Sequence, residues 1–425
     1  MDKKLILIQL NEINFNLVKK YIKKYDFKNL KYLLANNKNS KKTKSENKYE
    51  LLEPWIQWFS LYTGKSAKDH GIFRLGDSIH YNQELIFNKI ENLNYKVGIV
   101  SSMNAINSLK KPSYFIPDPW TKSKTDNSFW SNKISNLLNS TINNNSGKLF
   151  NISNIINLFL IFIKFANFFN LHVYFYYLVT SFKYKWRKAL FLDLLINDIH
   201  LKLVGKKNPN FSCVFLNAGA HIQHHHLFKS EFVKNNSKKD PIKEAYHLYD
   251  KLLKEYLKHK NYEFIIYTGL SQDINEDPEY YYRLQNHDKF LRYFDIKFKS
   301  VNPRMSRDFE IEFLNQKDAE LAAKELALIR TINKENCKIF EIIDVRDKNI
   351  FVTLTYPKKI EIDLKISNNK KMLDFNNNVN FVAEKNGIHS EIGYLFYSEN
   401  LSKFFDINDL NIIDIHNIIL NYFND

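Results

Sequence analysis

The chain is poor in cysteine: only Cys213 and Cys337 occur among its 425 residues. Two thiols are too few for a disulfide framework, so a reducing compartment, the cytoplasm, is the expected location. A long apolar stretch at the start is also lacking, because the run Leu5–Leu10 ends at Asn11 and Glu12. A secretory signal needs about 7–15 apolar residues. The short run therefore predicts a buried strand.

Signatures of nucleic-acid binding are absent as well. The sequence contains no helix-turn-helix, zinc-finger or aromatic RNA-binding motif. It does carry a formal charge of +16, from 62 Lys and Arg against 46 Asp and Glu. Lys is abundant throughout, together with Asn and Ile, which favours a charge spread evenly over the surface; an anionic ligand or a membrane surface is the alternative. Nucleic acid is not an expected partner.

Apolar runs separated by helical patterns indicate the fold class. The runs are Leu5–Leu10 and residues 96–100, 213–216 and 264–267, and residues 245–258 form one of the helical patterns between them. Continuous apolar strands that alternate with helices are typical of a parallel sheet covered on both faces. The sequence therefore predicts an α/β fold with a mostly parallel, doubly wound sheet.

Two segments interrupt this alternation and predict insertions. The expected core consists of residues 1–120, 205–308 and 385–425, and residues 121–204 are expected to form a helical, aromatic-rich cap. Residues 309–384 are expected to form a small α+β insertion, with strands at 309–313, 350–356 and 359–365 and a helix at 317–331.

The most apolar segment of the chain is residues 155–180. Lys164, His172 and three Asn interrupt it, whereas a spanning helix needs about 20 predominantly apolar residues. Its aromatic residues and the basic segment 183–188 fit a helix pair that lies in a membrane interface or covers a lipid-like substrate. A buried helical cap is the alternative.

Four motifs occur in a defined order. They are the strand Leu5–Leu10, Thr63-Gly64 with the turn 67–72 (Ala-Lys-Asp-His-Gly-Ile), residues 217–221 (Asn-Ala-Gly-Ala-His) and residues 387–393 (Gly-Ile-His-Ser-Glu-Ile-Gly). In this order they resemble the alkaline-phosphatase superfamily, in particular its type I phosphodiesterase and nucleotide pyrophosphatase branch. The resemblance covers residues 1–120, 210–272 and 387–425. It implies an alkaline-phosphatase-like fold and phosphate-ester chemistry.

The resemblance also implies a reduced metal site. Members of this superfamily hold two zinc ions through Asp and His and attack with a Thr or Ser hydroxyl. The corresponding positions here are Asn11, Asn217 and Leu270-Ser271 for the metal ligands and Pro54 for the nucleophile. Because a neutral carboxamide is a poor zinc ligand, the resemblance implies at most one divalent metal, zinc, held by His221 and His389. It also implies no covalent intermediate at Pro54.

Polar residues nevertheless cluster where the missing ligands would be. Glu12 follows Asn11 at the end of the first strand, and an ionised carboxylate there is costly to bury unless it is paired. Residues 221–226 supply four His, of which His221 and His224 are three apart, a helical spacing that suits a metal or an acid–base pair. Glu12, His221 and His224 are therefore the predicted catalytic residues; a solvated His run is the alternative.

Further polar and aromatic side chains are predicted to bind substrate. They lie at the ends of the predicted strands or on the turn and helix after Glu53, where ligands bind in open α/β sheets. The candidates are Asn11, Trp55, Gln57, Ser60, Asn217, Ser271 and Gln272.

These features favour an enzyme of alkaline-phosphatase-like fold, a hydrolase or transferase with at most one metal. Its expected substrate is a phosphorylated or nucleotide-activated small molecule or a lipid-linked glycan, met at the cytoplasmic face of a membrane. The alternative is a catalytically inactive descendant that binds a phosphorylated ligand and regulates or scaffolds a pathway. Replacement of the ligands by Glu, Gln and several His favours the enzyme.

Overall fold

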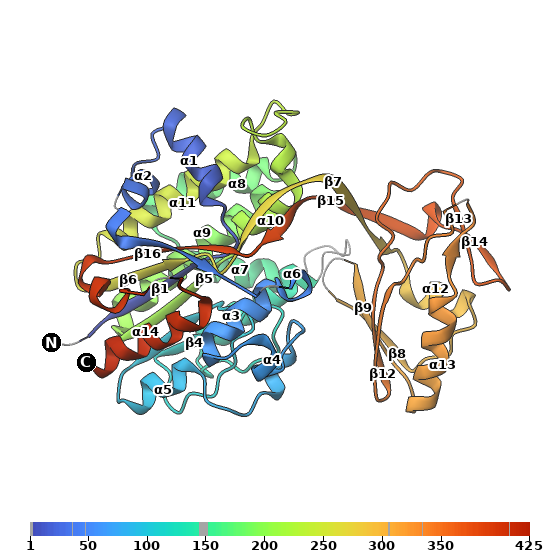
Figure 1. The fold of residues 1–425 in the computed structure, drawn as a ribbon, viewed down its shortest axis with the longest axis horizontal. Helices are drawn as coiled ribbons and strands as arrows, with labels where there is room; N and C mark the ends of the chain where they lie inside the picture. The colour runs from blue at the N-terminus through green and yellow to red at the C-terminus, as the bar shows by residue number, and fades with distance from the viewer. Residues whose placement is uncertain are drawn as a thin grey trace. The chain divides into compact units, whose positions relative to one another are not determined.

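The computed structural model describes residues 3–35, 37–46, 48–143, 152–304, 307–333, 335–407 and 409–425. The chain divides into two compact units, one of residues 1–274 and 387–425 and one of residues 275–386. The first unit contains most of the predicted core and the predicted cap, and the second contains the predicted α+β insertion together with residues 275–308 (Figure 1).

A seven-stranded sheet forms the centre of the first unit, in the order β2-β16-β6-β1-β5-β3-β4. Its strands are β1 (Leu5–Leu10), β2 (Ser40–Lys44), β3 (Val97–Val100), β4 (Tyr114–Ile116), β5 (Phe211–Leu216), β6 (Glu263–Tyr267) and β16 (Ile392–Tyr397). The pairs from β6 to β4 are parallel, and β16 runs antiparallel to both β6 and β2. The predicted α/β class with a mostly parallel sheet is confirmed.

Helices cover both faces of this sheet. They are α1 (Phe15–Lys24), α2 (Lys28–Ala35), α3 (Pro54–Thr63), α4 (Ala67–His70), α5 (Ile86–Asn92), α6 (Phe129–Asn143), α7 (Ile152–Phe165), α8 (Leu171–Thr180), α9 (Arg187–Lys207), α10 (Ala218–His226), α11 (Pro241–Leu257) and α14 (Ile412–Asn424). Figure 1 shows α3, α5 and α14 on one side of the sheet and α1, α2, α9 and α11 on the other.

The central strand β1 explains why the predicted strands read as continuous apolar runs. Ile6, Ile8 and Leu10 pack into the core on the face of α9 and α11, while Leu5 and Leu7 pack into the core on the face of α3 and α14. A strand that is buried on both faces favours apolar residues at nearly every position, and the one polar residue of β1, Gln9, is bonded to the Tyr62 hydroxyl inside the core. The first polar side chains beyond Leu10 therefore lie at the carboxyl edge of the sheet.

The second unit begins earlier in the sequence than predicted. Strand β7 (Ser271–Leu284) pairs with β15 (Val379–Ser390) and carries the chain out of the first unit at residue 275, whereas the prediction kept residues up to 308 in the core. The other elements of this unit are β8 (Ser300–Pro303), β9 (Asp308–Glu312), β10 (Arg330–Thr331), β11 (Ile342–Arg346), β12 (Asn349–Thr353), β13 (Lys365–Ser367), β14 (Met372–Asp374), α12 (His287–Tyr293) and α13 (Gln316–Ala327).

One predicted strand of the second unit is wrong. Residues 359–365 alternate apolar and charged side chains, but the segment forms a turn in which the Leu364 amide donates to the Glu361 carbonyl oxygen at 3.2 Å. Ile360 and Leu364 are buried, whereas Ile362 is 85% exposed. Because the turn breaks the two-residue period, the three apolar side chains do not share a face.

A buried histidine makes the first unit sensitive to acid. His200 of α9 is fully buried between the Tyr256 hydroxyl at 2.9 Å and the Ser212 hydroxyl at 2.7 Å. Burial lowers its pKa from 6.5 to about 3, with a smaller contribution from His259. The unfolded chain therefore binds a proton below pH 6.5 that the folded chain excludes, so this contribution to stability is complete above that pH and declines as the pH falls.

His200→Gln is expected to reduce the acid sensitivity of the free energy of unfolding. At about pH 5 the proton that His200 takes up on unfolding lowers the free energy of unfolding by about 2 kcal/mol. Urea unfolding of the wild type and the variant at about pH 7.5 and pH 5 measures how much stability each protein loses between the two pH values. Equal losses of stability in the two proteins would contradict the assignment.

Candidate metal centre

Glu12 is held at the carboxyl edge of the sheet by the backbone around it. The Asn11 amide donates to the carbonyl oxygen of Leu216 in β5 at 3.1 Å, and the Glu12 amide donates to the carbonyl oxygen of Thr268, just after β6, at 3.0 Å. Glu12 adopts a left-handed backbone conformation with φ of 58°, which is uncommon for a residue with a side chain. This bend after β1 fixes the direction of a carboxylate that is only 2% exposed.

The helix that carries His224, α10, follows β5 directly and is positioned by a buried aspartate. The Asp193 carboxylate, from α9, accepts the backbone amides of Asn217 at 3.2 Å and Ala218 at 2.8 Å and the Tyr249 hydroxyl at 2.8 Å. Burial raises the pKa of Asp193 to about 6. An anion at a helix N-terminus satisfies amides that have no partner within the helix, so Asp193 sets where α10 begins.

The third residue, His389, reaches the same place from β15. Gly387, two residues earlier on that strand, passes so close to the site that a Cβ atom there would lie 2.7 Å from Gln272 Oε1 and 2.8 Å from the Gln223 carbonyl oxygen. Real Cβ atoms do not approach so closely. The glycine therefore allows β15 to bring His389 next to α10.

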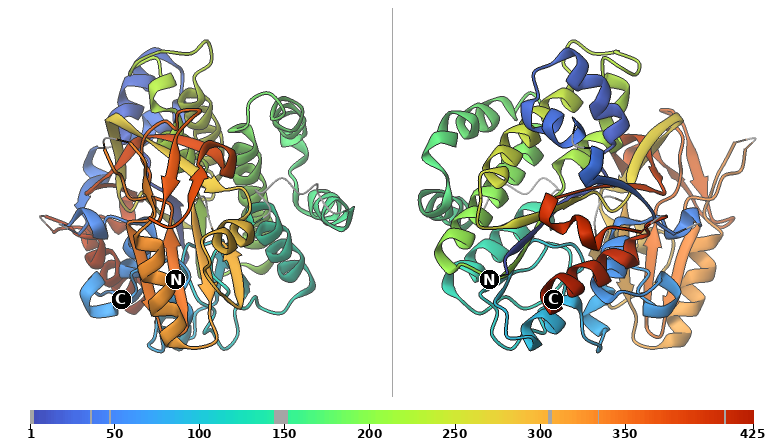
Figure 2. Two further views of the ribbon diagram at one scale, coloured as in Figure 1. Left: turned by 90° about the vertical axis from the view of Figure 1, so that its right-hand side faces the viewer. Right: turned by 60° about the vertical axis from the view of Figure 1, so that its left-hand side comes forward.

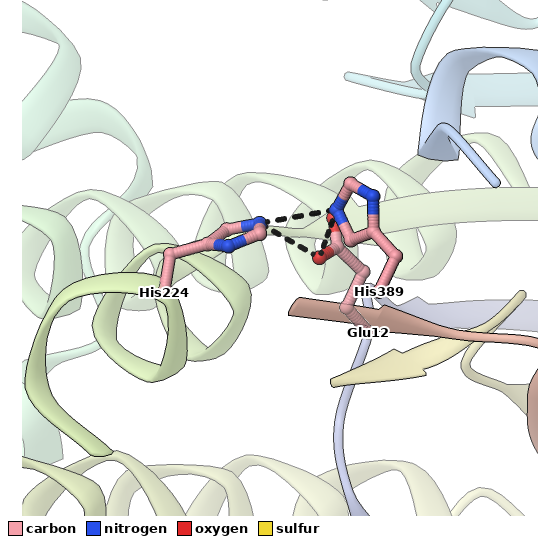
Figure 3. Close-up of side chains that lie close together, drawn as sticks. All are labelled: Glu12, His224 and His389. Carbon is pink, nitrogen blue, oxygen red and sulfur yellow. Dashed lines mark hydrogen bonds and ion pairs between the residues drawn. The ribbon is translucent and has the colours of Figure 1, made fainter. Parts of the chain in front are cut away.

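Three ligand atoms converge where these segments meet (Figure 3). Glu12 Oε2 lies 3.0 Å from His224 Nε2 and 3.1 Å from His389 Nε2, and the two Nε2 atoms are 3.3 Å apart. Ligand atoms about 2.0–2.1 Å from a tetrahedral zinc ion are separated by about 3.3–3.4 Å. The three atoms thus form nearly the triangle that three corners of a zinc tetrahedron require.

The outer contacts of His224 determine which of its nitrogens carries a proton. His224 Nδ1 lies 3.3 Å from the Gly387 carbonyl oxygen, which can only accept, so Nδ1 carries the proton and Nε2 presents a lone pair. That lone pair faces the Glu12 carboxylate, which can also only accept. The contact is repulsive unless a cation lies between them, and a metal ion or an added proton meets this need.

His389 has an outer carboxylate of the kind that orients metal-binding imidazoles. Its Nδ1 lies 3.7 Å from Glu53 Oε2, at the start of α3. Carbonyl and carboxylate partners on the far nitrogen are typical of histidines that bind metal, because they fix the tautomer and the ring orientation. The Gly387 carbonyl oxygen is such a partner for His224, whereas Glu53, at a distance longer than a hydrogen bond, is a charged neighbour of His389 Nδ1.

Glu12 is surrounded by groups that stabilise its charge. Burial raises the pKa of Glu12, but attraction to His389 and His224 in their protonated form, together with hydrogen bonds from them, outweighs burial and holds the pKa well below the ordinary 4.5. Oε1 accepts from Asn11 Nδ2 at 2.8 Å, and Oε2 also accepts from Gln272 Nε2. An ionised carboxylate with two imidazoles is a donor set that suits zinc, and the group Glu12, His224 and His389 is the one within the described ranges that fits a metal.

Part of the predicted substrate-binding set surrounds this centre. Asn11 Nδ2 also donates to Asn217 Oδ1 at 2.8 Å, and Asn11 Oδ1 accepts from Trp58 Nε1 at 2.8 Å. Gln272 is fully buried, and its Oε1 has no hydrogen-bond partner. Asn11, Asn217 and Gln272 therefore lie together with Glu12, and their role in substrate binding stays a prediction.

The remaining predicted substrate-binding residues have structural contacts of their own. The Ser60 hydroxyl lies 3.0 Å from His70 Nε2, Gln57 Nε2 donates to the Leu51 carbonyl oxygen at 2.8 Å, and Trp55 Nε1 donates to the Phe73 carbonyl oxygen at 3.1 Å. Ser271 is buried at the first position of β7. None of these contacts reaches Glu12, His224 or His389.

His221 is the main difference from the sequence-based site. It was predicted as a catalytic residue and, with His389, as a metal ligand, but its side chain is exposed and the metal-compatible group contains His224 instead. His221 packs beside His225, with ring centroids 5.0 Å apart. On a helix with about 100° per residue, His224 lies about 60° away from His221, and that rotation directs one imidazole to Glu12 and leaves the other outside the centre.

Sequence reasoning missed two residues that support the centre. Gln223 Nε2 donates to the Glu12 carbonyl oxygen at 2.7 Å, and Gln223 Oε1 accepts the Asn14 amide at 3.1 Å. Asp193 was also missed, although an aspartate within the apolar residues 189–196 is a visible signal of a buried, paired carboxylate. No comparable signal marks Gln223.

Comparison with known proteins found similarity to solved structures alone. Neither a protein-family model nor a curated protein matches the sequence. Murine ectonucleotide pyrophosphatase/phosphodiesterase 5 matches with a TM-score of 0.44 and 13% identity, covering 99% of this chain and 95% of that chain. The phosphonoacetate hydrolase of Sinorhizobium meliloti 1021 matches with a TM-score of 0.42 and 9% identity, covering 99% and 96%. The alkaline phosphatase of the Antarctic bacterium TAB5 matches with a TM-score of 0.43 and 11% identity, covering 99% and 98%.

These similarities extend along the whole chain, and two of the three proteins carry the names of the enzyme classes that the sequence motifs resemble. The TM-scores lie below 0.5 and the identities below 25%. They do not assign the chemistry of this chain, which follows from the residues of the centre itself.

Proposed function

We propose that this protein is a phosphoesterase that uses one bound zinc ion, held by Glu12, His224 and His389, to act on a small phosphorylated molecule. The observation that carries the proposal is the convergence of His224 Nε2 and His389 Nε2 on the Glu12 carboxylate, at 3.0 and 3.1 Å from Oε2. Three protein ligands leave the fourth position of a tetrahedral zinc ion open, as in catalytic rather than structural sites.

The residues of the centre fit a zinc ion through their donor chemistry as well as their spacing. A zinc ion in a three-ligand site supplies Lewis acidity to an oxygen of the substrate. In this proposal Glu12 is a ligand of the zinc ion and not the general base that the sequence predicts. Its carboxylate is 2% exposed and is enclosed by Asn11, Gln272 and two imidazoles. Its role is to neutralise the cation and fix its position.

Direct displacement is the reaction type that these residues favour. Position 54 is the proline that begins α3, and it offers no hydroxyl to form a covalent intermediate. Glu53 precedes it, with a third of its side chain exposed and its carboxylate beside His389. Glu53 is thus a carboxylate able to accept a proton from a water or an acceptor hydroxyl that attacks phosphorus.

Asn11 and Asn217 make this proposed centre different from a two-metal site. Their amide side chains bond to each other and to Glu12 and Trp58, and neutral amides do not offset the charge of a second divalent cation. The substrate class remains that of the motif resemblance: a phosphomonoester, a phosphodiester or a nucleotide-activated sugar, including a lipid-linked one.

The test is hydrolysis by the purified full chain before and after removal of metal. A chelator is expected to abolish turnover of p-nitrophenyl phosphate, bis-p-nitrophenyl phosphate or a sugar nucleotide, and one equivalent of zinc is expected to restore it. Turnover that persists in metal-free protein would overturn the proposal. Binding of these compounds without any turnover in the zinc-loaded protein would support the inactive, ligand-binding alternative instead.

A further inference from the structure

A bent pair of helices exposes an unusual amount of apolar surface. Helices α7 and α8 are joined through the short helix η4 (Phe168–Asn170), and their axes differ by 120°. Together the two helices have the length and apolar composition of a membrane segment, whereas no single helix of the described ranges is long and apolar enough to span a membrane. Figure 2, left, shows this pair standing out from one side of the sheet unit. We call residues 152–180 the helical pair.

Thirteen exposed large apolar side chains lie on or next to the helical pair. They are Ile155, Ile156, Phe159, Leu160, Ile163, Phe168, Phe169, Leu171, Phe175, Tyr176, Leu178, Val179 and Phe182. Phe168, Phe169 and Phe182 are 78%, 80% and 85% exposed. Scattered apolar residues are normal on a protein surface, but so many exposed ones within about thirty consecutive residues favour an interaction site.

Hydrogen bonds and buried side chains attach the inner face of the helical pair to α9, so the exposed side chains stay on its outer face. Asp198 of α9, which is 4% exposed, accepts the Asn167 amide at 2.7 Å, Asn170 Nδ2 at 3.0 Å and the Tyr174 hydroxyl at 2.8 Å. Ile161 and Tyr174 are buried in the core that α9 shares. These contacts hold the bend between the helices against α9 while the apolar side chains above face outward.

The charge of this region identifies the kind of surface that it would meet. The sequence contains no Asp or Glu from residue 127 to residue 192, although it contains seven Lys and Arg there. Lys183, Lys185 and Lys188 follow the helical pair directly. Apolar and aromatic side chains beside cations are the composition that binds the interface of a bilayer with anionic lipids.

We propose that the helical pair inserts its outer face into the interface of an anionic lipid bilayer, so that the protein lies on the membrane without spanning it. A second copy of this chain fits the surface less well, because two such faces would bring Lys183, Lys185 and Lys188 of one copy toward the same lysines of the other. Arg187 does not add to this repulsion, since it is buried and paired with Glu244. Lipid headgroups instead oppose those cations, while the bilayer accepts the phenylalanines of the bend.

Flotation of the purified full chain with vesicles tests this proposal. The wild type is expected to float with vesicles of phosphatidylcholine and phosphatidylglycerol, and to bind phosphatidylcholine alone more weakly. The triple variant Phe168→Ser, Phe169→Ser, Phe175→Ser is expected to reduce the partition coefficient by about tenfold or more. The matched control, Leu314→Ser with Ile362→Ser, changes two side chains of the other unit that are 78% and 85% exposed, and it is expected to bind as the wild type does.

Three results would overturn the proposal. The first is a wild type that floats with neither vesicle, and the second is a triple variant that binds as well as the wild type. The third is a dimer in light scattering that the triple variant converts to a monomer, together with no vesicle binding, which would assign the surface to a second copy. Circular dichroism of the triple variant, expected to match the wild type, separates loss of binding from loss of fold.

Discussion

Replacing His224 by alanine is expected to lower the affinity of the protein for zinc more than about 100-fold and to abolish zinc-dependent turnover. Loss of an outer partner of a ligand already costs about 10–100-fold, and His224 supplies one of three direct ligand atoms in this account. Its side chain is partly exposed, so the change removes few packing contacts. Competition with a chromophoric zinc chelator measures the affinity directly.

His225→Ala is the matched control, because it removes the next imidazole of the same helix. The rings of His224 and His225 have centroids 6.1 Å apart, and His225 is not part of the metal-compatible group. Zinc affinity and turnover are expected to stay within about threefold of the wild type. Equal losses in the two variants would mean that the whole His run, rather than the imidazole facing Glu12, binds the metal.

Replacing Asp193 by alanine is expected to destabilise the protein by about 3 kcal/mol or more and to weaken zinc binding by about 10–100-fold. The change leaves the buried amides of Asn217 and Ala218 without their acceptor at the start of α10. It also removes the acceptor of Tyr249, whose hydroxyl in turn accepts the Gly219 amide at 2.7 Å. Chemical denaturation and zinc titration of the folded variant measure the two effects separately.

Asp198→Ala provides the comparison, since Asp198 is the other buried aspartate of α9 with amide and tyrosine partners. Its partners belong to the helical pair rather than to α10. The variant is therefore expected to lose stability to a similar extent while zinc affinity stays nearly unchanged. A similar drop in zinc affinity for both variants would show that general loosening of α9, not the start of α10, controls the site.

The sheet was predictable from sequence because burial on both faces leaves a plain pattern. β1 and β5 are apolar at every position but Gln9 and Ser212, and strands of that kind belong to covered parallel sheets. Glu12 was predictable for a related reason, since a polar side chain at the carboxyl edge of such a sheet has few structural uses. His389 was predicted from the motif of residues 387–393 and its resemblance, not from the sheet.

The choice between His221 and His224 could not be made from sequence. Helical spacing allows either residue to face the sheet edge, and the rotation of α10 is set by Asp193, which is distant in sequence. The boundary of the second unit was hidden for a similar reason. Strand β7 runs without a break from Ser271 to Leu284 across the boundary at residue 275, and Pro278, three residues beyond that boundary, does not end the strand.

The central claim is that two imidazoles and one carboxylate bind a single zinc ion at the carboxyl edge of β1. Zinc anomalous diffraction from crystals of the full chain tests it most directly. The expected result is one zinc peak per chain, about 2.0–2.2 Å from Glu12 Oε2, His224 Nε2 and His389 Nε2. A chain without a zinc peak, a second peak beside Asn11 and Asn217, or a single peak at His221 would contradict the account.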